Sequence, residues 1–194
     1  ERGFPMTIVR PSHTYDRTKI PLYGYYTTID RMRRGKPVVA HGDGTSLWVL
    51  TYHRDFAAAF VGLLGLPQAI GQAYQITSDE VLTWNQIFAI LAHAAGVKPH
   101  LVHIASETIA AFDPEHGPGL VGDKGQSVIF DNTKIKRAVP GWAATTPFVR
   151  GAEEMIAWFD GDPARRLVDP QVDRLMDRMV AAHERMTSLA HREA

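Results

Sequence analysis

Met6-Thr7-Ile8-Val9-Arg10-Pro11-Ser12-His13-Thr14-Tyr15 is the stretch that decides how this chain folds. Met6–Val9 predicts a short strand covered on both faces, because its apolar and β-branched residues have no helical period. Pro11 has no N–H to donate, so we expect the strand to end there. Ser12, His13 and Tyr15 would then lie at the carboxyl end of the strand, where open α/β sheets bind their ligands.

The composition is that of an ordinary globular protein. The chain has 194 residues, of which 45% are apolar and 22% are charged. Its 21 acidic and 21 basic residues give a formal net charge of zero, which disfavours a general nucleic-acid partner. It has no cysteine, which excludes disulfides, cysteine zinc sites and thiol catalysis. Without a long apolar run or a signal-peptide pattern, we expect no membrane partner and a cytoplasmic location.

The first helix is expected over residues 28–34, with Thr27 as its N-cap. Basic side chains gather at its end: Arg31, Arg33, Arg34 and Lys36. They would form either a solvated helix end that complements the helix dipole or an anion site. We favour the solvated end.

A tight turn, Gly42-Asp43-Gly44, lies between short strands expected over residues 37–40 and 46–51. We therefore expect a hairpin in which Val38 lies opposite Leu47–Leu50.

Strands and helices alternate through the rest of the chain. Further strands are expected over residues 73–77, 101–104 and 127–130, and helices over 56–64, 84–95, 107–112, 132–138 and 148–159. Asp55 is the expected N-cap of the first of these helices, and Thr83 with Gln86 forms a capping box before the second. Residues 113–126 hold four glycines and two prolines and predict an irregular, mobile excursion. The alternation predicts an α/β fold with mainly parallel strands.

The composition changes after Gly161-Asp162-Pro163, and Asp169-Pro170 predicts the start of a long amphipathic helix. Its apolar stripe consists of Val172, Leu175, Met176, Met179, Met186 and Leu189. We expect this stripe to pack against the rest of the fold or against another subunit. The chain would thus consist of a domain over residues 1–160 and a helical extension over residues 161–194.

Three further functions, namely dinucleotide binding by a glycine-rich loop, metal binding and α/β-hydrolase catalysis, are not supported by the sequence. Residues 117–122 spell G-x-G-x-x-G, but no strand is expected before them and no helix start after them, so we do not interpret them as a dinucleotide loop. His100 and His103 lie close together without a third ligand at metal-binding spacing. The chain has no G-x-S-x-G motif, which removes support for an α/β-hydrolase.

Six segments, taken in order, carry a resemblance to a known family. They are residues 7–15, 42–45, 51–57, 73–78, 83–86 and 131–136. With this order and spacing, residues 1–160 resemble the carboxyl-terminal half of the extended short-chain dehydrogenase/reductase family, the NAD-dependent epimerase/dehydratases. The resemblance implies the edge portion of a Rossmann-type parallel sheet, made by residues 6–9, 55–64 and 73–77. It also implies a small α/β substrate-binding lobe, made by the hairpin, residues 101–104 and the glycine-rich excursion.

The resemblance implies NAD or NADP as cofactor and a small-molecule substrate. Pro11, Ser12 and His13 match the loop beside the nicotinamide, where Pro11 and Ser12 offer backbone contacts to the carboxamide. Substrate contacts are implied for His13, Tyr15, Trp48, His53 and Arg54. Nucleotide-sugar enzymes usually carry an asparagine at the position of His13. An imidazole that titrates near neutral pH could bind substrate or shuttle a proton there, and a structural role is the alternative.

The chain departs from the family in two ways. Leu47 and Trp48 stand where nucleotide-sugar enzymes commonly place an arginine for the diphosphate, so an apolar or sugar-like substrate on an aromatic floor is favoured. The family's glycine-rich turn is missing. Its Tyr-x-x-x-Lys pair is missing too: Tyr15 and Lys19 have the right spacing, but they follow the strand, whereas the family's pair lies on the helix before it. Since a strand comes almost directly after Glu1, we expect a fragment that is inactive alone.

Three functions remain open. We favour the substrate-binding portion of an NAD(P)-dependent epimerase, dehydratase or reductase that transfers a hydride to or from a hydroxyl- or carbonyl-bearing substrate. The second is a non-catalytic relative that serves as a binding or regulatory scaffold, although the neutral charge disfavours RNA. The third is an oligomerising module. We also expect self-association through the strand at residues 6–9, whose edge would be unpaired, or through the helix at residues 172–189.

Overall fold

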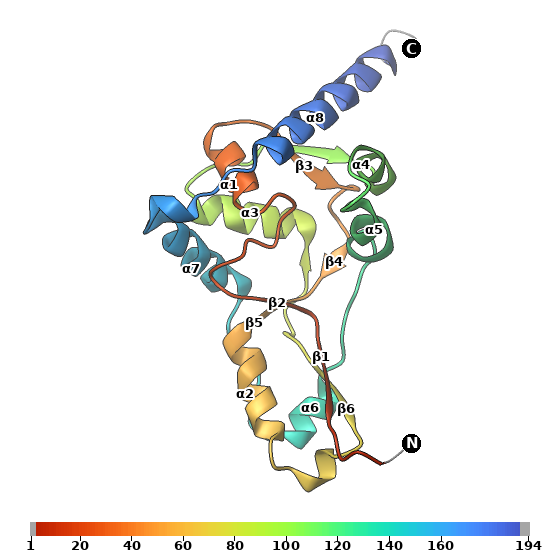
Figure 1. The fold of residues 1–194 in the computed structure, drawn as a ribbon, viewed down its shortest axis with the longest axis vertical. Helices are drawn as coiled ribbons and strands as arrows, with labels where there is room; N and C mark the ends of the chain where they lie inside the picture. Colours follow the sequence, from red (N-terminus) through yellow and green to blue (C-terminus); the bar gives the residue numbers. More distant parts are fainter. Residues whose placement is uncertain (1–2, 191–194) are drawn as a thin grey trace.

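Pairs of strands, mostly parallel, form the framework of the molecule, which is a computed structural model that describes residues 3–190 (Figure 1). The strands are β1 (Ile8–Pro11), β2 (His13–Tyr15), β3 (Val38–His41), β4 (Leu47–Trp48), β5 (Leu50–Tyr52), β6 (Ala73–Ile76), β7 (Leu82–Thr83) and β8 (Leu101–Ile104). The pairs β1–β6, β2–β5 and β3–β8 are parallel, and β4–β7 is antiparallel. The predicted α/β fold with mainly parallel pairing is confirmed.

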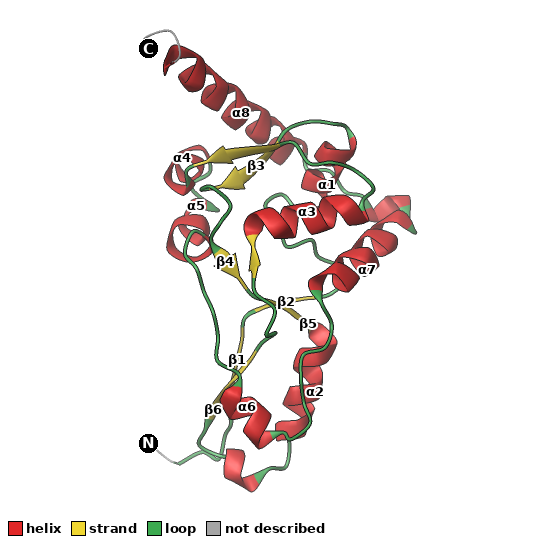
Figure 2. Ribbon diagram, turned by 180° about the vertical axis from the view of Figure 1, so that it is seen from behind, coloured by secondary structure: helices red, strands yellow, loops and turns green. Residues whose placement is uncertain are grey.

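Helices cover these strand pairs. They are α1 (Tyr26–Arg33), α2 (His53–Leu63), α3 (Trp84–Ala94), α4 (Ser106–Phe112), α5 (Gly117–Gly119), α6 (Thr133–Ala138), α7 (Phe148–Asp160) and α8 (Pro170–Ala190). Three further helical turns are η1 (Pro67–Ala69), η2 (Leu120–Lys124) and η3 (Pro163–Arg165). The molecule is elongated: β1, β6, α2 and α6 form its lower part, and β3 with most of the helices forms its upper part (Figure 2). The pair β2–β5 lies between them.

The opening strand ends at Pro11, as expected, but the prediction that it is covered on both faces is wrong. Met6 is 48% exposed and Ile8 is 42% exposed. The reason is that β1 has a single neighbour, β6, within the described part of the chain. Its other edge is open.

The expected hairpin does not form. Val38 pairs with Leu101 in β8, and Leu47 pairs with Thr83 in β7. The Gly42-Asp43-Gly44 turn is present, but it is attached to the start of α3, because the backbone N–H of Asn85 donates to the Gly44 carbonyl at 2.9 Å. This attachment separates β4 from β3. Residues 127–130 do not form the expected strand either.

Two expected N-caps form tertiary contacts instead. The Thr27 side chain lies inside α1, where its hydroxyl accepts a hydrogen bond from the Asp169 backbone N–H at the start of α8. The Asp55 side chain lies in the first turn of α2 and accepts from the Thr146 backbone N–H. By contrast, the capping box of Thr83 and Gln86 is confirmed at the start of α3.

The basic cluster at the end of α1 is not a solvated helix end. The Arg31 side chain is fully buried, and its guanidinium donates to the Asp173 carboxylate at 2.5 Å and the Asp177 carboxylate at 2.8 Å. It also donates to the Pro37 carbonyl. Both carboxylates belong to α8, so this charge attaches the final helix to the body.

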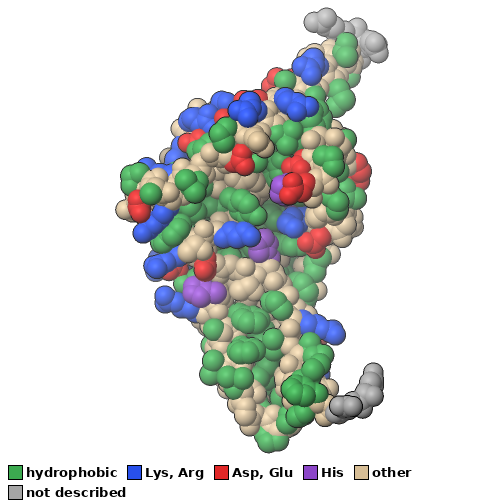
Figure 3. All heavy atoms as spheres, viewed as in Figure 1, with side chains coloured by type: hydrophobic (Ala, Val, Ile, Leu, Met, Phe, Trp, Pro, Cys, Tyr) green, Lys and Arg blue, Asp and Glu red, His purple; other side chains and the backbone are tan. Residues whose placement is uncertain are grey.

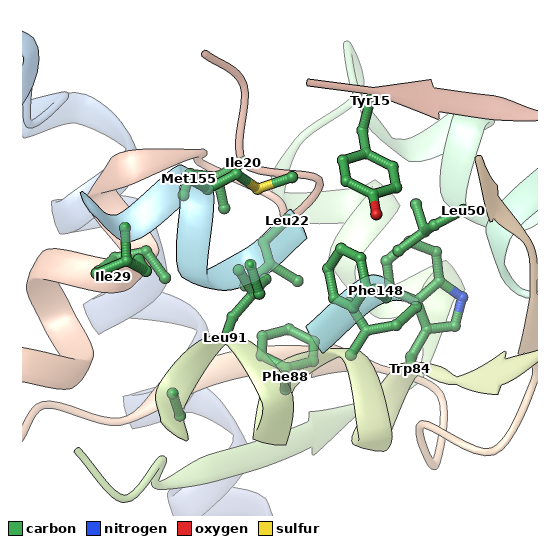
Figure 4. Close-up of a cluster of buried hydrophobic side chains, with 14 of the residues drawn as sticks. Tyr15, Ile20, Leu22, Ile29, Leu50, Trp84, Phe88, Leu91, Phe148 and Met155 are labelled. Carbon is green, nitrogen blue, oxygen red and sulfur yellow. The ribbon is translucent and has the colours of Figure 1, made fainter. Parts of the chain in front are cut away.

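The main hydrophobic core lies between α3, α7 and the β2–β5 pair (Figure 4). Its largest fully buried side chains include Phe148, Met155, Ile29 and Leu91. The Tyr15 side chain points into this cluster. Its ring is 4% exposed and packs against Phe148 with ring centroids 5.3 Å apart.

The glycine-rich segment is not irregular. It forms α5 and η2, and Leu120 is buried among side chains from α4 and α8. A Cβ on Gly117 would lie 2.5 Å from the Cβ of Ala110, so close packing on α4 explains this glycine. A helix, α4, precedes the G-x-G-x-x-G run, which agrees with our rejection of a dinucleotide loop.

The long final helix is covered over only part of its stripe. Met176, Met179 and Val180 are buried against the body. Met186 is 55% exposed and Leu189 is 58% exposed, on the part of α8 that projects from the upper end of the molecule (Figure 1).

Candidate functional site

Two cavities meet beyond the carboxyl end of β1. Cavity A has a volume of about 410 Å³, and the residues of its wall used below are Lys19, Tyr23, His41, His116 and Lys124. Cavity B has a volume of about 400 Å³ and is lined by Pro11, Ser12 and Trp48, among others. His13 and Lys124 line both cavities. His13 therefore lies where the sequence placed it, at the centre of the candidate site.

His13 has a defined tautomer. The indole N–H of Trp48 donates a hydrogen bond to His13 Nδ1 over 3.1 Å. Because an indole N–H can only donate, Nδ1 is an acceptor and the ring proton resides on Nε2. His13 thus presents an N–H donor through Nε2.

Burial, followed by the nearby Lys124 and Lys19 ammonium groups, lowers the pKa of His13 to about 4 against the opposing effect of Asp123. The ring is neutral at pH 7. The prediction that it titrates near neutrality is wrong, because the side chain is enclosed and flanked by two cations. It can bind a ligand as a neutral donor, but it is not poised to shuttle a proton at neutral pH.

Ser12 presents a second donor, towards cavity B. Its hydroxyl lies 2.8 Å from the Thr51 hydroxyl, which also accepts from the Ser78 backbone N–H. Thr51 is fully buried, so its own proton needs an acceptor, and Ser12 Oγ is the one in reach. With Thr51 as donor, the Ser12 proton is left for a ligand. Pro11, beside it, also lines cavity B.

Trp48 forms part of the wall of cavity B and not of cavity A. It is 7% exposed, and its ring lies beside that of Trp84 with centroids 5.5 Å apart. The Lys124 ammonium lies over its ring, 5.7 Å from the centroid. The main contribution of Trp48 is to orient His13 and support Lys124.

The other predicted substrate residues do not gather at cavities A and B. Tyr15 and His53 border a third cavity of about 280 Å³. The Tyr15 ring is in the core, and its buried hydroxyl has no hydrogen-bond partner. Arg54 is exposed on α2 and lines none of the three cavities. The Lys19 ammonium lies over the ring of Tyr25, 5.1 Å from its centroid.

Sequence reasoning missed several residues of cavity A. Lys19 and Lys124 bring positive charge, and His41 and His116 bring two further imidazoles. Figure 3 shows basic and histidine side chains gathered near the middle of the molecule. His41 Nε2 donates to the Lys124 carbonyl at 3.1 Å, which attaches η2 to β3. A signal was present only for His116, which follows Asp113 by three residues.

Between residues 3 and 190, no three His, Asp or Glu side chains are arranged to hold a metal ion. Nor does this part of the chain contain a helix with the length and apolarity needed to cross a membrane.

No family model matches the sequence. A curated relative, the chloroplast stem-loop binding protein of 41 kDa b from Arabidopsis thaliana, is 25% identical over 104 residues, which make up 53% of this chain and 27% of that protein. Solved structures extend the similarity. UDP-glucose 4-epimerase from Thermotoga maritima has a TM-score of 0.62 at 23% identity and covers 83% of this chain. A dTDP-glucose 4,6-dehydratase from Streptomyces venezuelae, with NAD bound, has a TM-score of 0.61 at 19% identity and covers 81%.

The chain spans 48% of the epimerase and 45% of the dehydratase. The resemblance read from the sequence is confirmed at the level of the fold. Over 83% and 81% of its length, respectively, this chain has an α/β fold similar to that of about half of the epimerase and of the dehydratase.

Proposed function

We propose that this chain is the substrate-binding portion of an NAD(P)-dependent epimerase, dehydratase or reductase that acts by hydride transfer on a sugar-like or other hydroxyl- or carbonyl-bearing substrate. One observation carries the proposal: cavities A and B meet at His13, beyond the carboxyl end of β1, in a chain with the fold of such enzymes. Ligands of open α/β sheets bind at this end.

Cavity A is the proposed substrate site. It has room for a small molecule, and its wall combines the neutral His13 donor with the Lys19 and Lys124 ammonium groups. Leu47 and Trp48 stand where nucleotide-sugar enzymes commonly carry an arginine, so these positions supply no positive charge for a diphosphate. The two lysines supply positive charge from other segments, so an anionic sugar derivative fits this cavity as well as a neutral one.

Cavity B is the proposed place of the nicotinamide. Its free Ser12 proton suits a carboxamide oxygen, and Pro11 and His13 lie beside it. The cofactor, when bound, supplies the hydride acceptor. Ser12 and His13 would hold the amide and the substrate side of the ring. The glycine-rich turn and the Tyr-x-x-x-Lys pair are absent from this chain, so we propose that the activity needs further protein and that residues 1–194 alone are inactive.

We also propose the division into two parts that the sequence predicts. Residues 1–160 would form the Rossmann-edge segments and the substrate-binding lobe, and residues 161–194 a helical extension. We further propose a cytoplasmic homo-oligomer. The open edge of β1 and the exposed end of α8 support self-association.

Calorimetric titration of the 194-residue chain with glucose 1-phosphate, an anionic sugar derivative without a nucleotide, tests the substrate site. We expect saturable binding, weakened roughly 3- to 10-fold in His13→Ala, as the loss of one hydrogen bond predicts. His93→Ala is the matched control, because His93 is exposed on α3 and lines neither cavity. Absence of binding by the unaltered chain, or equal binding by both variants, would contradict the proposal.

A second candidate function is stem-loop binding, since the curated relative that matches 53% of this chain is named for it. In that case the chain would be a binding scaffold without catalysis. The zero net charge argues against a large contribution from phosphate contacts. Fluorescence anisotropy with a labelled RNA stem-loop separates the two functions. Tight binding that weakens steeply with added salt would favour the scaffold.

A further inference from the structure

A hydrogen-bonded cluster on the wall of cavity A has no part in the function proposed above. The Asp113 carboxylate accepts a hydrogen bond from the Tyr23 hydroxyl at 2.6 Å. It also accepts from the His116 backbone N–H at 3.2 Å and lies 2.9 Å from His116 Nδ1. The three side chains come from the loop before α1 and from the turn between α4 and α5. Tyr23 and His116 line the cavity.

The surroundings of Asp113 keep it ionised. Burial by itself would raise the pKa of the carboxyl, but the donors from Tyr23 and His116 outweigh burial and hold the pKa below its ordinary value. A carboxylate oxygen can only accept, so the proton between Asp113 and His116 belongs to Nδ1 of the imidazole. In the uncharged form of the His116 ring, the lone pair therefore lies on Nε2.

The two ends of this pair differ in exposure. The Asp113 side chain is 11% exposed, whereas the His116 side chain is 50% exposed. No hydrogen bond occupies His116 Nε2 within the described residues. A pair with a purely structural role would gain from enclosing both partners, because water competes less with buried hydrogen bonds. Here the carboxylate lies behind the ring, and the ring borders the cavity.

Two of the three histidines that line cavity A thus have opposite tautomers. His13 presents an N–H donor, because Trp48 donates to its Nδ1. His116 presents an acceptor, because its Nδ1–H donates to Asp113. A hydroxyl group both donates and accepts, so a ligand with several hydroxyls matches both rings.

We propose that His116 is a ligand-binding residue of cavity A whose Nε2 accepts a hydrogen bond from a hydroxyl of a polyhydroxylated ligand, with Asp113 as its positioning residue. The proposal rests on the proposed function for the identity of the cavity. It adds which groups of the ligand cavity A would bind: several hydroxyl groups, and not only a negative charge.

Nitrogen-15 NMR of the histidine rings tests the positioning role without any ligand. We expect unaltered His116 to be protonated on Nδ1 and not on Nε2, and the Nε2–H tautomer to increase in Asp113→Asn, whose amide can donate to Nδ1. Tyr23→Phe is the matched variant, since it removes a donor to Asp113 but leaves the carboxylate, and it should keep the Nδ1–H tautomer. An Nε2–H tautomer in the unaltered chain would overturn the proposal.

Titration with glucose 1-phosphate tests the binding role. We expect His116→Ala to weaken binding roughly 3- to 10-fold and His116→Gln, which keeps an acceptor oxygen, to restore part of the loss. His93→Ala again serves as the control. Equal binding by His116→Ala and the unaltered chain overturns the role of His116 and leaves the proposed function standing. Lack of binding by the unaltered chain overturns both.

Discussion

At the scale of single residues, neighbours decide the chemistry of the candidate site. His13 is neutral and a donor because of Trp48, burial and two lysines, while His116 is an acceptor because of Asp113. The position of His13 at the site could be predicted, since Pro11 ends the strand just before it. Its low pKa could not, because the burial that mainly lowers it and the nearby Lys124 both depend on distant segments.

The lowered pKa of His13 makes the stability of the protein depend on pH. The unfolded chain binds a proton at His13 near pH 6.5, whereas the folded chain does so only near pH 4, the value to which burial, Lys124 and Lys19 lower the pKa. Stability is therefore complete above pH 6.5 and decreases as the pH falls towards 4. Between about pH 7.5 and about pH 4.5, we expect the unaltered chain to lose about 2–3 kcal/mol more than His13→Gln in urea unfolding.

His93→Gln, which alters an exposed histidine, should keep the full pH dependence. If His13→Gln and the unaltered chain lost the same stability over this range, His13 would have an ordinary pKa in the folded protein.

At the scale of elements, local signals were reliable and distant partners were not. The capping box of Thr83 and Gln86 could be predicted because both residues lie within one helical turn. The hairpin prediction was wrong because the amide side chain of Asn85 donates to the Asp43 carbonyl, 42 residues away, and holds the turn against α3. A turn motif defines a bend in the chain, but not which strand lies beside the next one.

The attachment of α8 to α1 depends on Arg31. We expect Arg31→Lys to reduce the free energy of unfolding by about 2–4 kcal/mol, because three donors on one ammonium nitrogen cannot replace the five hydrogen bonds that the guanidinium makes to two carbonyls and two carboxylates. Urea unfolding measures the change. Arg34→Lys is the matched control: its side chain is 39% exposed and its ion pairs should contribute less than about 1 kcal/mol. Equal losses in the two variants would contradict a special role for Arg31.

At the scale of the whole molecule, the lower part leaves apolar surface uncovered. Ile8 in β1 is 42% exposed, and Ile70 in the turn before β6 is 51% exposed. An open strand edge with apolar neighbours tends to pair with another chain. The chain also spans less than half of the solved enzymes it resembles. This edge is a candidate surface for a second copy or for further protein.

Light scattering tests self-association through this edge. We expect the apparent mass of the 194-residue chain to rise with concentration, and Ile8→Lys to suppress the rise, because a charge on an edge strand opposes pairing. Ile129→Lys is the control, since Ile129 is 62% exposed in the segment before α6, outside the strand pairs. If the unaltered chain kept the mass of a monomer at all protein concentrations, the prediction would be wrong.

The sequence by itself determined the α/β class, the strand that ends at Pro11, the capping box of α3 and the family resemblance. These depend on side-chain period, backbone restrictions and motif order, all of which are local or ordered along the chain. Only the tertiary structure decided which strands pair, that Arg31 is buried, that Tyr15 lies in the core, and that His13, His116 and Lys124 surround one cavity. Those features depend on contacts between distant segments, which composition and spacing do not encode.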